Sequence, residues 1–347
     1  MLPLPQELRC EAGTPGCANV RLEVPYYAAF GNHDGYIRGT LANEPGLQEA
    51  SIAFGRHYMR EQHEFIDEFF ETGAAPGPVG HGFNRVDAAR MNDADGRNDG
   101  YYAFDAGKKS RFRMIVMNTI IDGTDERVPE PMREAKNPFA LDSGWIDAAQ
   151  FEWIKGQLAD AAARGQLVLL FSHHPDLTFA EFGSFSQGAP LGISAATLDA
   201  ELASHPNVIA WVAGHTHRHR IRAFKVADGT GSNGVVTAPV ACKGPGPCAG
   251  FWQIETASLV DFPQEARLLE FYQQGETGVI RSAVLQHDFE RSKRLAEKDD
   301  RCQFYLTDPA MVEQAITDAD ISTLCKQGGT RDGEPKDRNV ELIFRMP

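Results

Sequence analysis

Gly31-Asn32-His33-Asp34 is the stretch that decides the expected fold, because it directly follows the apolar run Tyr-Tyr-Ala-Ala-Phe at positions 26–30. The same arrangement occurs twice more. Ser-His-His-Pro (172–175) follows the apolar run 167–171, and Gly-His-Thr-His (214–217) follows the run 208–213. A short apolar run that ends in a turn is typical of a buried strand. Ligands collect at the carboxyl ends of strands in α/β folds, so we expect these loops to converge.

The overall composition restricts the class of protein. The chain has 347 residues, 42% of them hydrophobic, and its net charge is −14. An acidic surface repels nucleic acid and anionic membranes, so nucleic acid is a disfavoured partner. The sequence contains no apolar run near the ~20 residues that a membrane span needs. We therefore expect a protein without a membrane span.

The six cysteines form three pairs that are local in sequence. An even number of cysteines in loop-like sequence suits disulfides and an oxidising compartment, and the alternative is six free thiols. The first residues show neither the basic nor the apolar region of a signal peptide, so we expect that export requires a segment this chain does not contain. The pairs are Cys10 with Cys17, Cys242 with Cys248, and Cys302 with Cys325.

Periodicity and turn residues predict the remaining elements. A long turn-rich insert is expected over 35–100, and a charged tail with a helix near 309–317 is expected after 288. Between them we expect a hairpin, two helices and then a meander of five short strands in an antiparallel sheet. The hairpin covers 101–105 and 111–118, and the two helices cover 147–164 and 194–204. The five strands cover 221–226, 235–238, 251–256, 267–272 and 279–285.

The three loops carry an amide and several imidazoles. Asn and neutral His are ligands of first-row cations such as Mn, Fe or Zn rather than of Ca or Mg. Because His215 and His217 are two residues apart in a loop, they can face two different ions. The sequence therefore predicts a transition-metal site where the three loops meet. His219, just beyond, is expected on an exposed strand edge.

These motifs, in this order, resemble the calcineurin-like metallophosphoesterases. Further stretches are similar to a bacterial branch of that family with long inserts between its motifs: 26–35, Gly-Pro-Val-Gly-His-Gly-Phe at 77–83, the region 150–153, and 250–258. The resemblance covers about 22–290. Members of this branch usually carry a twin-arginine export signal, so the resemblance implies a periplasmic or extracellular protein.

The resemblance also implies a fold. It is an α/β sandwich of two mixed β-sheets flanked by helices, here missing its first β-α-β portion. The phosphoesterase domain would span 1–290, and 291–347 would be a charged extension packed on it or trailing from it.

The functional residues follow from the resemblance position by position. Two transition metal ions (Mn, Fe or Zn) would hold a hydroxide for in-line attack on the phosphorus of a small-molecule phosphoester. His33, with Asp34 behind it, matches the proton donor to the leaving group. The His-x-Pro register favours His173 over His174 as a ligand. His174 is then expected to support the ligands or to line the substrate pocket, and His81 either approaches the substrate from the insert or has a structural role in its loop. The matching metal ligands are Asn32, His173 and His215 for the second ion and His217 for the first.

The sequence departs from the family at one place. The chain contains no Asp-x-His and no Gly-Asp, although these motifs supply ligands of the first ion and the bridging carboxylate in the family. We expect an N-terminally incomplete version of an enzyme. The alternative is a catalytically impaired remnant or pseudoenzyme that keeps a partial metal site. The choice between monoester and diester, and the oligomeric state, stay open.

Overall fold

The structure is a computed structural model. It describes residues 27–35, 100–107, 110–120, 143–179, 192–225, 234–236, 250–259, 263–286, 331 and 333–346. Its helices are α1 (Asn32–Gly35), α7 (Ala148–Ala163), η3 (Asp176–Thr178), α8 (Ala195–Ser204) and η5 (Pro335–Asp337). Its strands are β1 (Tyr102–Asp105), β2 (Phe112–Val116), β3 (Leu167–Phe171), β4 (Val208–Ala213), β5 (Arg220–Lys225), β6 (Gly234–Val236), β7 (Gly250–Glu255), β8 (Ala266–Gln274), β9 (Thr277–Leu285) and β10 (Val340–Arg345).

Among the described residues, the main sheet has seven strands in the order β1-β2-β3-β4-β7-β5-β6. β2, β3, β4 and β7 are parallel, whereas β1 pairs antiparallel with β2, and β5 pairs antiparallel with both β7 and β6. The expected hairpin and the expected strands 167–171 and 208–213 are therefore confirmed. The parallel register aligns the carboxyl ends of β3 and β4, which precede the two histidine-bearing loops.

The second sheet has the order β10-β9-β8, and both of its described pairings are antiparallel. The prediction of two mixed sheets is therefore wrong for this sheet. The two-residue connection Gly275–Glu276 between β8 and β9 forces an antiparallel hairpin, and Gly275 adopts the positive φ of 63° that such turns favour. The expected five-strand meander is also wrong, because β5, β6 and β7 belong to the main sheet.

The chain over 27–30 forms no strand, in contrast to the strand expected over about 21–30; the rest of that range lies outside the described residues. This segment is instead attached to β1 through side chains. The hydroxyl of Tyr102 donates a hydrogen bond to the carbonyl of Ala28 (2.7 Å), and Tyr27 stacks on Phe104 with ring centroids 3.7 Å apart. Because these contacts use side chains rather than a backbone ladder, the segment lies over the sheet without extending it.

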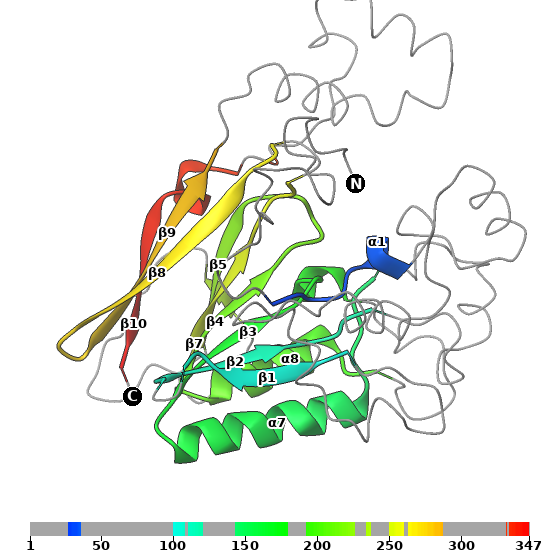
Figure 1. The fold of residues 1–347 in the computed structure, drawn as a ribbon, viewed down its shortest axis with the longest axis vertical. Helices are drawn as coiled ribbons and strands as arrows, with labels where there is room; N and C mark the ends of the chain where they lie inside the picture. The colour runs from blue at the N-terminus through cyan, green and yellow to red at the C-terminus, as the bar shows by residue number, and fades with distance from the viewer. Residues whose placement is uncertain are drawn as a thin grey trace, which may run out of the picture.

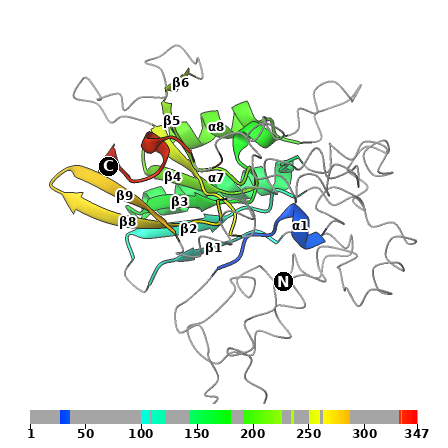
Figure 2. The same ribbon diagram turned by 90° about the horizontal axis from the view of Figure 1, so that it is seen from above.

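The two longer helices cover one face of the main sheet, as Figure 2 shows. α7 begins where expected: the carboxylate of Asp147 accepts a hydrogen bond from the backbone N–H of Gln150 (2.7 Å), a cap worth about 1 kcal/mol. α8 begins in the same way at Ser194. The side chain of Gln150 bonds both the N–H and the carbonyl of Asn118, which ties α7 to the loop after β2.

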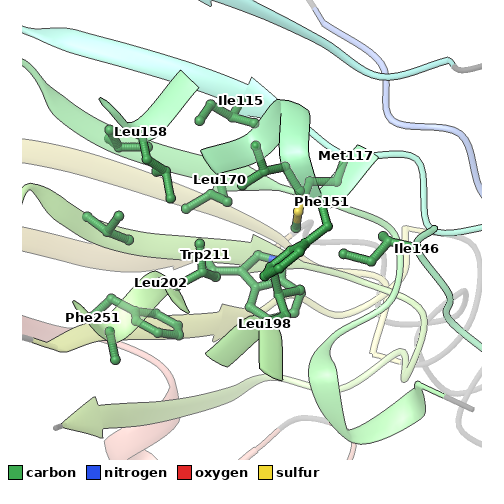
Figure 3. Packing of buried hydrophobic residues seen from close by; sticks show 14 of the residues in the cluster. Ile115, Met117, Ile146, Phe151, Leu158, Leu170, Leu198, Leu202, Trp211 and Phe251 are labelled. Atoms are coloured by element: carbon green, nitrogen blue, oxygen red, sulfur yellow. The ribbon is translucent and has the colours of Figure 1, made fainter. Parts of the chain in front are cut away.

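The core under these helices contains side chains from β2, β3, β4 and β7, and Figure 3 shows how they pack around Trp211. The indole N–H of Trp211 donates to the hydroxyl of Ser172 (2.7 Å), and this hydroxyl donates to the carbonyl of His174 (2.7 Å). The core therefore supports the first histidine-bearing loop directly.

The opposite face of the main sheet packs against the second sheet in a separate apolar cluster, which includes Leu169 of β3, Ile254 of β7, Ile280 of β9 and Leu342 of β10. Figure 1 shows β8, β9 and β10 on the side of the molecule away from α1. β10 belongs to the expected C-terminal extension and pairs with β9, so this segment is part of the second sheet. The division of the chain at residue 290 stays a prediction.

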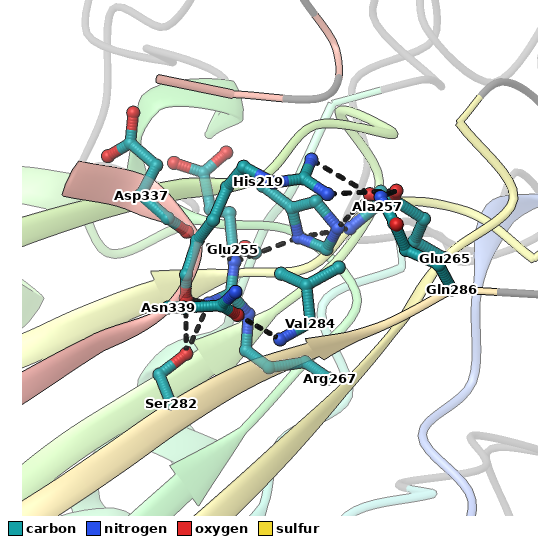
Figure 4. A network of polar contacts seen from close by, with 11 residues as sticks. His219, Glu255, Ala257, Glu265, Arg267, Ser282, Val284, Gln286, Asp337 and Asn339 are labelled. Atoms are coloured by element: carbon teal, nitrogen blue, oxygen red, sulfur yellow. Dashed lines mark hydrogen bonds and ion pairs between the residues drawn. The ribbon is translucent and has the colours of Figure 1, made fainter. Parts of the chain in front are cut away.

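A buried polar network joins β5, β8 and the C-terminal segment (Figure 4). His219 is fully buried, so its expected exposed position is wrong. Its ring Nε2 lies 3.1 Å from a carboxylate oxygen of Glu265, which also accepts hydrogen bonds from Arg338 (2.9 and 3.0 Å). The N–H of Ile221 donates to the carboxylate of Asp337 (2.9 Å). The network fixes the chain just beyond the Gly-His-Thr-His loop.

The expected helix at 309–317, the body of the insert 36–99, His81 and all six cysteines lie outside the described residues. Within the described part, no helix has the length and apolar character that a bilayer crossing requires.

Candidate metal centre

Asn32 lies in a turn that two hydrogen bonds between Gly31 and Asp34 close. The N–H of Asp34 donates to the carbonyl of Gly31 (3.0 Å), and the carboxylate of Asp34 accepts from the N–H of Gly31 (2.9 Å). This reciprocal pair begins α1 and leaves Asn32 buried, while His33 and Asp34 are exposed. Asp34 therefore has a structural role in this turn; the catalytic role expected for it stays a prediction.

The two histidine-bearing loops are joined to each other through their backbones. The N–H of Ser172 donates to the carbonyl of Val212 (3.1 Å), and the N–H of Gly214 donates to the carbonyl of His173 (2.9 Å). These bonds continue the pairing of β3 with β4 beyond the last strand residues. His173 and His215 are thus brought together by the parallel register of their strands.

Three of the predicted ligands converge. Nε2 of His173 lies 2.6 Å from Oδ1 of Asn32 and 3.2 Å from Nδ1 of His215. These residues are far apart in the sequence, and they come from three different loops. The convergence expected from the motifs is therefore present for Asn32, His173 and His215.

The spacing of these atoms can be compared with that around a metal ion. Ligand atoms bonded at about 2.1 Å, with angles between tetrahedral and octahedral values, lie about 3.0–3.4 Å apart. The separation between His173 and His215 falls in this range. The separation between His173 and Asn32 is shorter than this range by about 0.4 Å, so these two atoms would move apart by that amount to share an ion. The amide and the two imidazoles therefore have a donor set and spacing that fit one first-row transition metal ion.

The protonation state of the two imidazoles also fits. Desolvation, followed by the neighbouring His215, His217 and His33, lowers the pKa of His173 to about 3. Desolvation, followed by His217 and His33, lowers the pKa of His215 to about 4. Both rings are therefore neutral at pH 7, the form in which an imidazole binds a metal ion.

His174 lies behind these ligands and is fully buried. Its Nδ1 is 3.0 Å from the hydroxyl of Thr119, and its backbone N–H donates to the same hydroxyl (3.2 Å). Ring nitrogens of His173, His174 and His215 all lie within 4.8 Å of one another. Either Asn32 or His174 is thus close enough to serve as a third ligand beside His173 and His215. The substrate role expected for His174 stays a prediction.

Sequence reasoning missed Thr119, which orients the ring of His174. The sequence signal that identified the other loops applies to Thr119 as well, because Thr119 is a polar residue that follows the carboxyl end of the strand β2.

His33 and His217 form a second pair beside the ligands. Their ring centroids are 6.5 Å apart, with 37° between the ring planes. Among the residues that the structure describes, no further imidazole, thiolate or carboxylate joins them in a cluster of three. The first-ion role expected for His217 and the proton-donor role expected for His33 both stay predictions.

The Gly-His-Thr-His loop has an unusual backbone. His215 and His217 have φ values of 63° and 52°, in the left-handed region, which costs a residue with a side chain about 1–2 kcal/mol. Such a conformation persists only where the surrounding structure enforces it.

A cavity of about 1130 Å³ adjoins the site on the face of the sheet away from α7 and α8. Its lining is mainly apolar and includes Tyr27, Phe104, Phe171 and Val212. Ser172 and Ala213 also line it, and each directly precedes a residue of a histidine-bearing loop. The cavity therefore reaches the residues that precede the two histidine-bearing loops, and its lining does not include the candidate ligands themselves.

Comparison with known proteins adds a distant structural likeness. No protein-family model matches the sequence, and no curated protein matches it. Among solved structures, the chain is similar to a purple acid phosphatase from the seeds of yellow lupin (Lupinus luteus), with a TM-score of 0.28 and 13% sequence identity. The match covers 53% of this chain and 30% of the phosphatase chain, so the chain spans less than a third of the length of that protein.

Proposed function

We propose that this chain carries the metal-binding part of a phosphoester hydrolase that acts on a small-molecule substrate. The observation that carries the proposal is the convergence of Asn32, at the start of α1, with His173 and His215, which follow the carboxyl ends of β3 and β4. The order of the three motifs in the sequence supports the same reaction class, because it resembles that of the calcineurin-like metallophosphoesterases.

The chemistry of the site depends on the ion it would hold. A bound transition metal ion polarises a phosphoryl oxygen and lowers the pKa of water towards about 7. Asn32, His173 and His215 would hold this ion, and burial of Asn32 at 1% exposure limits the access of bulk water to it. His217 is our proposed ligand for a second ion.

His33 is our proposed proton donor to the leaving group. It is exposed, and its ring is close enough to those of His173 and His215 to act on them electrostatically. His33 also acts electrostatically on the neighbouring carboxylate of Asp34, and a proton donor of this kind has to reach the leaving group. The apolar cavity beside the site would receive the organic group of the substrate.

A second candidate function is a remnant that binds one ion without turnover. Two observations favour it: the chain lacks Asp-x-His and Gly-Asp, and the described residues form one cluster of three possible ligands. The two functions differ in the number of bound ions and in the rate of hydrolysis.

Metal content and turnover, measured on the same preparation, test the proposal. The chain is freed of metal with a chelator, loaded with Mn²⁺ or Zn²⁺, and assayed with p-nitrophenyl phosphate and its bis-ester. We expect bound metal and hydrolysis, both lost in His173→Ala and both retained in His205→Ala, a histidine that pairs with Glu201 away from the site. Bound metal without hydrolysis would establish the remnant, and no bound metal would overturn both functions.

A further inference from the structure

The Gly-His-Thr-His loop is anchored from below by a buried carboxylate. The hydroxyl of Thr216 donates a hydrogen bond to Oε2 of Glu255 (2.8 Å), a residue with no exposed surface at the end of β7. Thr216 stands between His215 and His217, which both have positive φ. A side-chain hydrogen bond thus holds the middle of a loop whose backbone conformation is unfavourable.

Glu255 is itself held rigidly. Arg220 lies directly opposite it in the antiparallel pairing of β5 with β7. The guanidinium of Arg220 donates two hydrogen bonds to the carboxylate, Nε to Oε1 and Nη2 to Oε2, each 2.7 Å long. Such a bidentate pair fixes both the position and the orientation of a carboxylate. Thr216 therefore binds to a fixed point of the sheet.

The same network reaches the other histidine-bearing loop. Nε of Arg222 lies 3.8 Å from Glu255, and its terminal nitrogens bind the carboxylate of Asp176 and the side chain of Gln253. Asp176 begins η3, directly after the Ser-His-His-Pro stretch. Arg222, Asp176 and Gln253 are all buried. The loops that carry His173 and His215 thus rest on one buried ionic network.

We propose that Thr216 and Glu255 are positioning residues for the histidines: their hydrogen bond holds His215 and His217 in the orientation that metal binding requires. The inference rests on the proposed metal site. Partners that orient metal ligands typically contribute 10–100-fold in metal affinity. Neither Thr216 nor Glu255 belongs to the set of ligands predicted from the motifs.

Thr216→Val tests the proposal, because valine keeps the branched shape of threonine and removes the hydroxyl. Glu255 keeps both bonds from Arg220 in this variant, and Thr216 is only partly buried, so the fold is retained. Thr216→Ser is the matched control, because it keeps the hydroxyl. We expect Thr216→Val to bind Zn²⁺ 10–100-fold more weakly than the wild type in competition with a chromophoric chelator, while it still unfolds cooperatively on heating in EDTA. Thr216→Ser should bind within about threefold of the wild type. Equal zinc affinity in Thr216→Val and the wild type would overturn the proposal.

A second measurement separates failure of this inference from failure of the proposed function. NMR of the metal-free protein reports the backbone of His215 and His217 whether or not the protein binds zinc. We expect the amide and Cα shifts of both residues to change in Thr216→Val and to stay near wild-type values in Thr216→Ser. A wild type that binds no zinc would refute the metal site alone. Unchanged shifts in Thr216→Val would refute the positioning role alone.

Discussion

Gly31→Ala is the substitution whose effect on the candidate site follows most directly from the geometry. A Cβ at this position would lie 2.9 Å from Nδ1, 3.1 Å from Cε1 and 3.2 Å from Cγ of the His173 ring. Favourable contacts of this kind lie at about 3.5–4.0 Å, so the ring has to retreat by roughly 0.5 Å. It has little room to do so, because the rings of His174 and His215 lie edge-on to it with centroids 4.9 and 5.1 Å away.

A shift of this size matters because a metal site tolerates only about 0.5 Å of misplacement in its ligands. We expect Gly31→Ala to weaken Zn²⁺ binding by about 10–100-fold, or about 1.4–2.8 kcal/mol. We expect it to lower the free energy of unfolding by about 1–3 kcal/mol through overpacking. Isothermal titration calorimetry measures the first quantity, and urea unfolding in EDTA measures the second.

Gly214→Ala is the matched control within the same site. A Cβ at Gly214 would have its nearest contact at 3.8 Å, with the carbonyl oxygen of His173, which is an ordinary van der Waals distance. We expect wild-type zinc affinity within about threefold in this variant. The reasoning is refuted if Gly31→Ala binds zinc as tightly as the wild type, or if both variants lose affinity equally.

Three further predictions concern stability. Leu198→Ala, at a fully buried position of α8, should cost about 2–5 kcal/mol in urea unfolding, and a loss below 1 kcal/mol would contradict the packing of this helix. Burial raises the pKa of Glu265, but hydrogen bonds from His219 and Arg338 outweigh it and hold the pKa at about 2. The free energy of unfolding should therefore fall as the pH drops from 4.5 towards 2, and less steeply in Glu265→Gln. Burial raises the pKa of Asp199 to about 8, so this carboxyl binds more protons in the folded than in the unfolded state between pH 4 and 8. Stability should decline as the pH rises across that range, and Asp199→Asn, followed by thermal unfolding, should flatten the decline; an unchanged slope would exclude a buried neutral Asp199.

The parts of the fold that sequence predicts are those with local signals. α7 has its cap at Asp147, its buried stripe at Phe151, Ile154 and Leu158, and its end at Gly165, all within one segment. The strands β3 and β4 are apolar along their length because both of their faces are buried. Here the local pattern and the tertiary environment require the same residues.

Other features depend on partners that are distant in sequence. β10 mixes apolar and charged residues, and it becomes a strand because β9 is available as a neighbour. His219 looks like a polar residue at a strand edge, yet Glu265 and Arg267, more than forty residues later, bury and bind it. Neither relationship leaves a signal in the local sequence.

The candidate site also contains some residues that the sequence identifies and others that it does not. Asn32, His173 and His215 were identifiable because each stands in a short motif directly after an apolar run. The residues that support them were not, because Glu255 lies inside the expected strand 251–256 and Thr216 occupies the variable position of its motif. Their contribution appears only when β5 and β7 are paired in register.

X-ray absorption at the zinc edge of the zinc-loaded chain tests the central claim most directly. Our account predicts a first shell of nitrogen and oxygen at about 2.0–2.1 Å that contains at least two imidazoles. In the double variant His173→Ala/His215→Ala, this imidazole signal should be lost. A shell without imidazole in the wild type, or an unchanged spectrum in the double variant, would contradict the claim that Asn32, His173 and His215 together hold a metal ion.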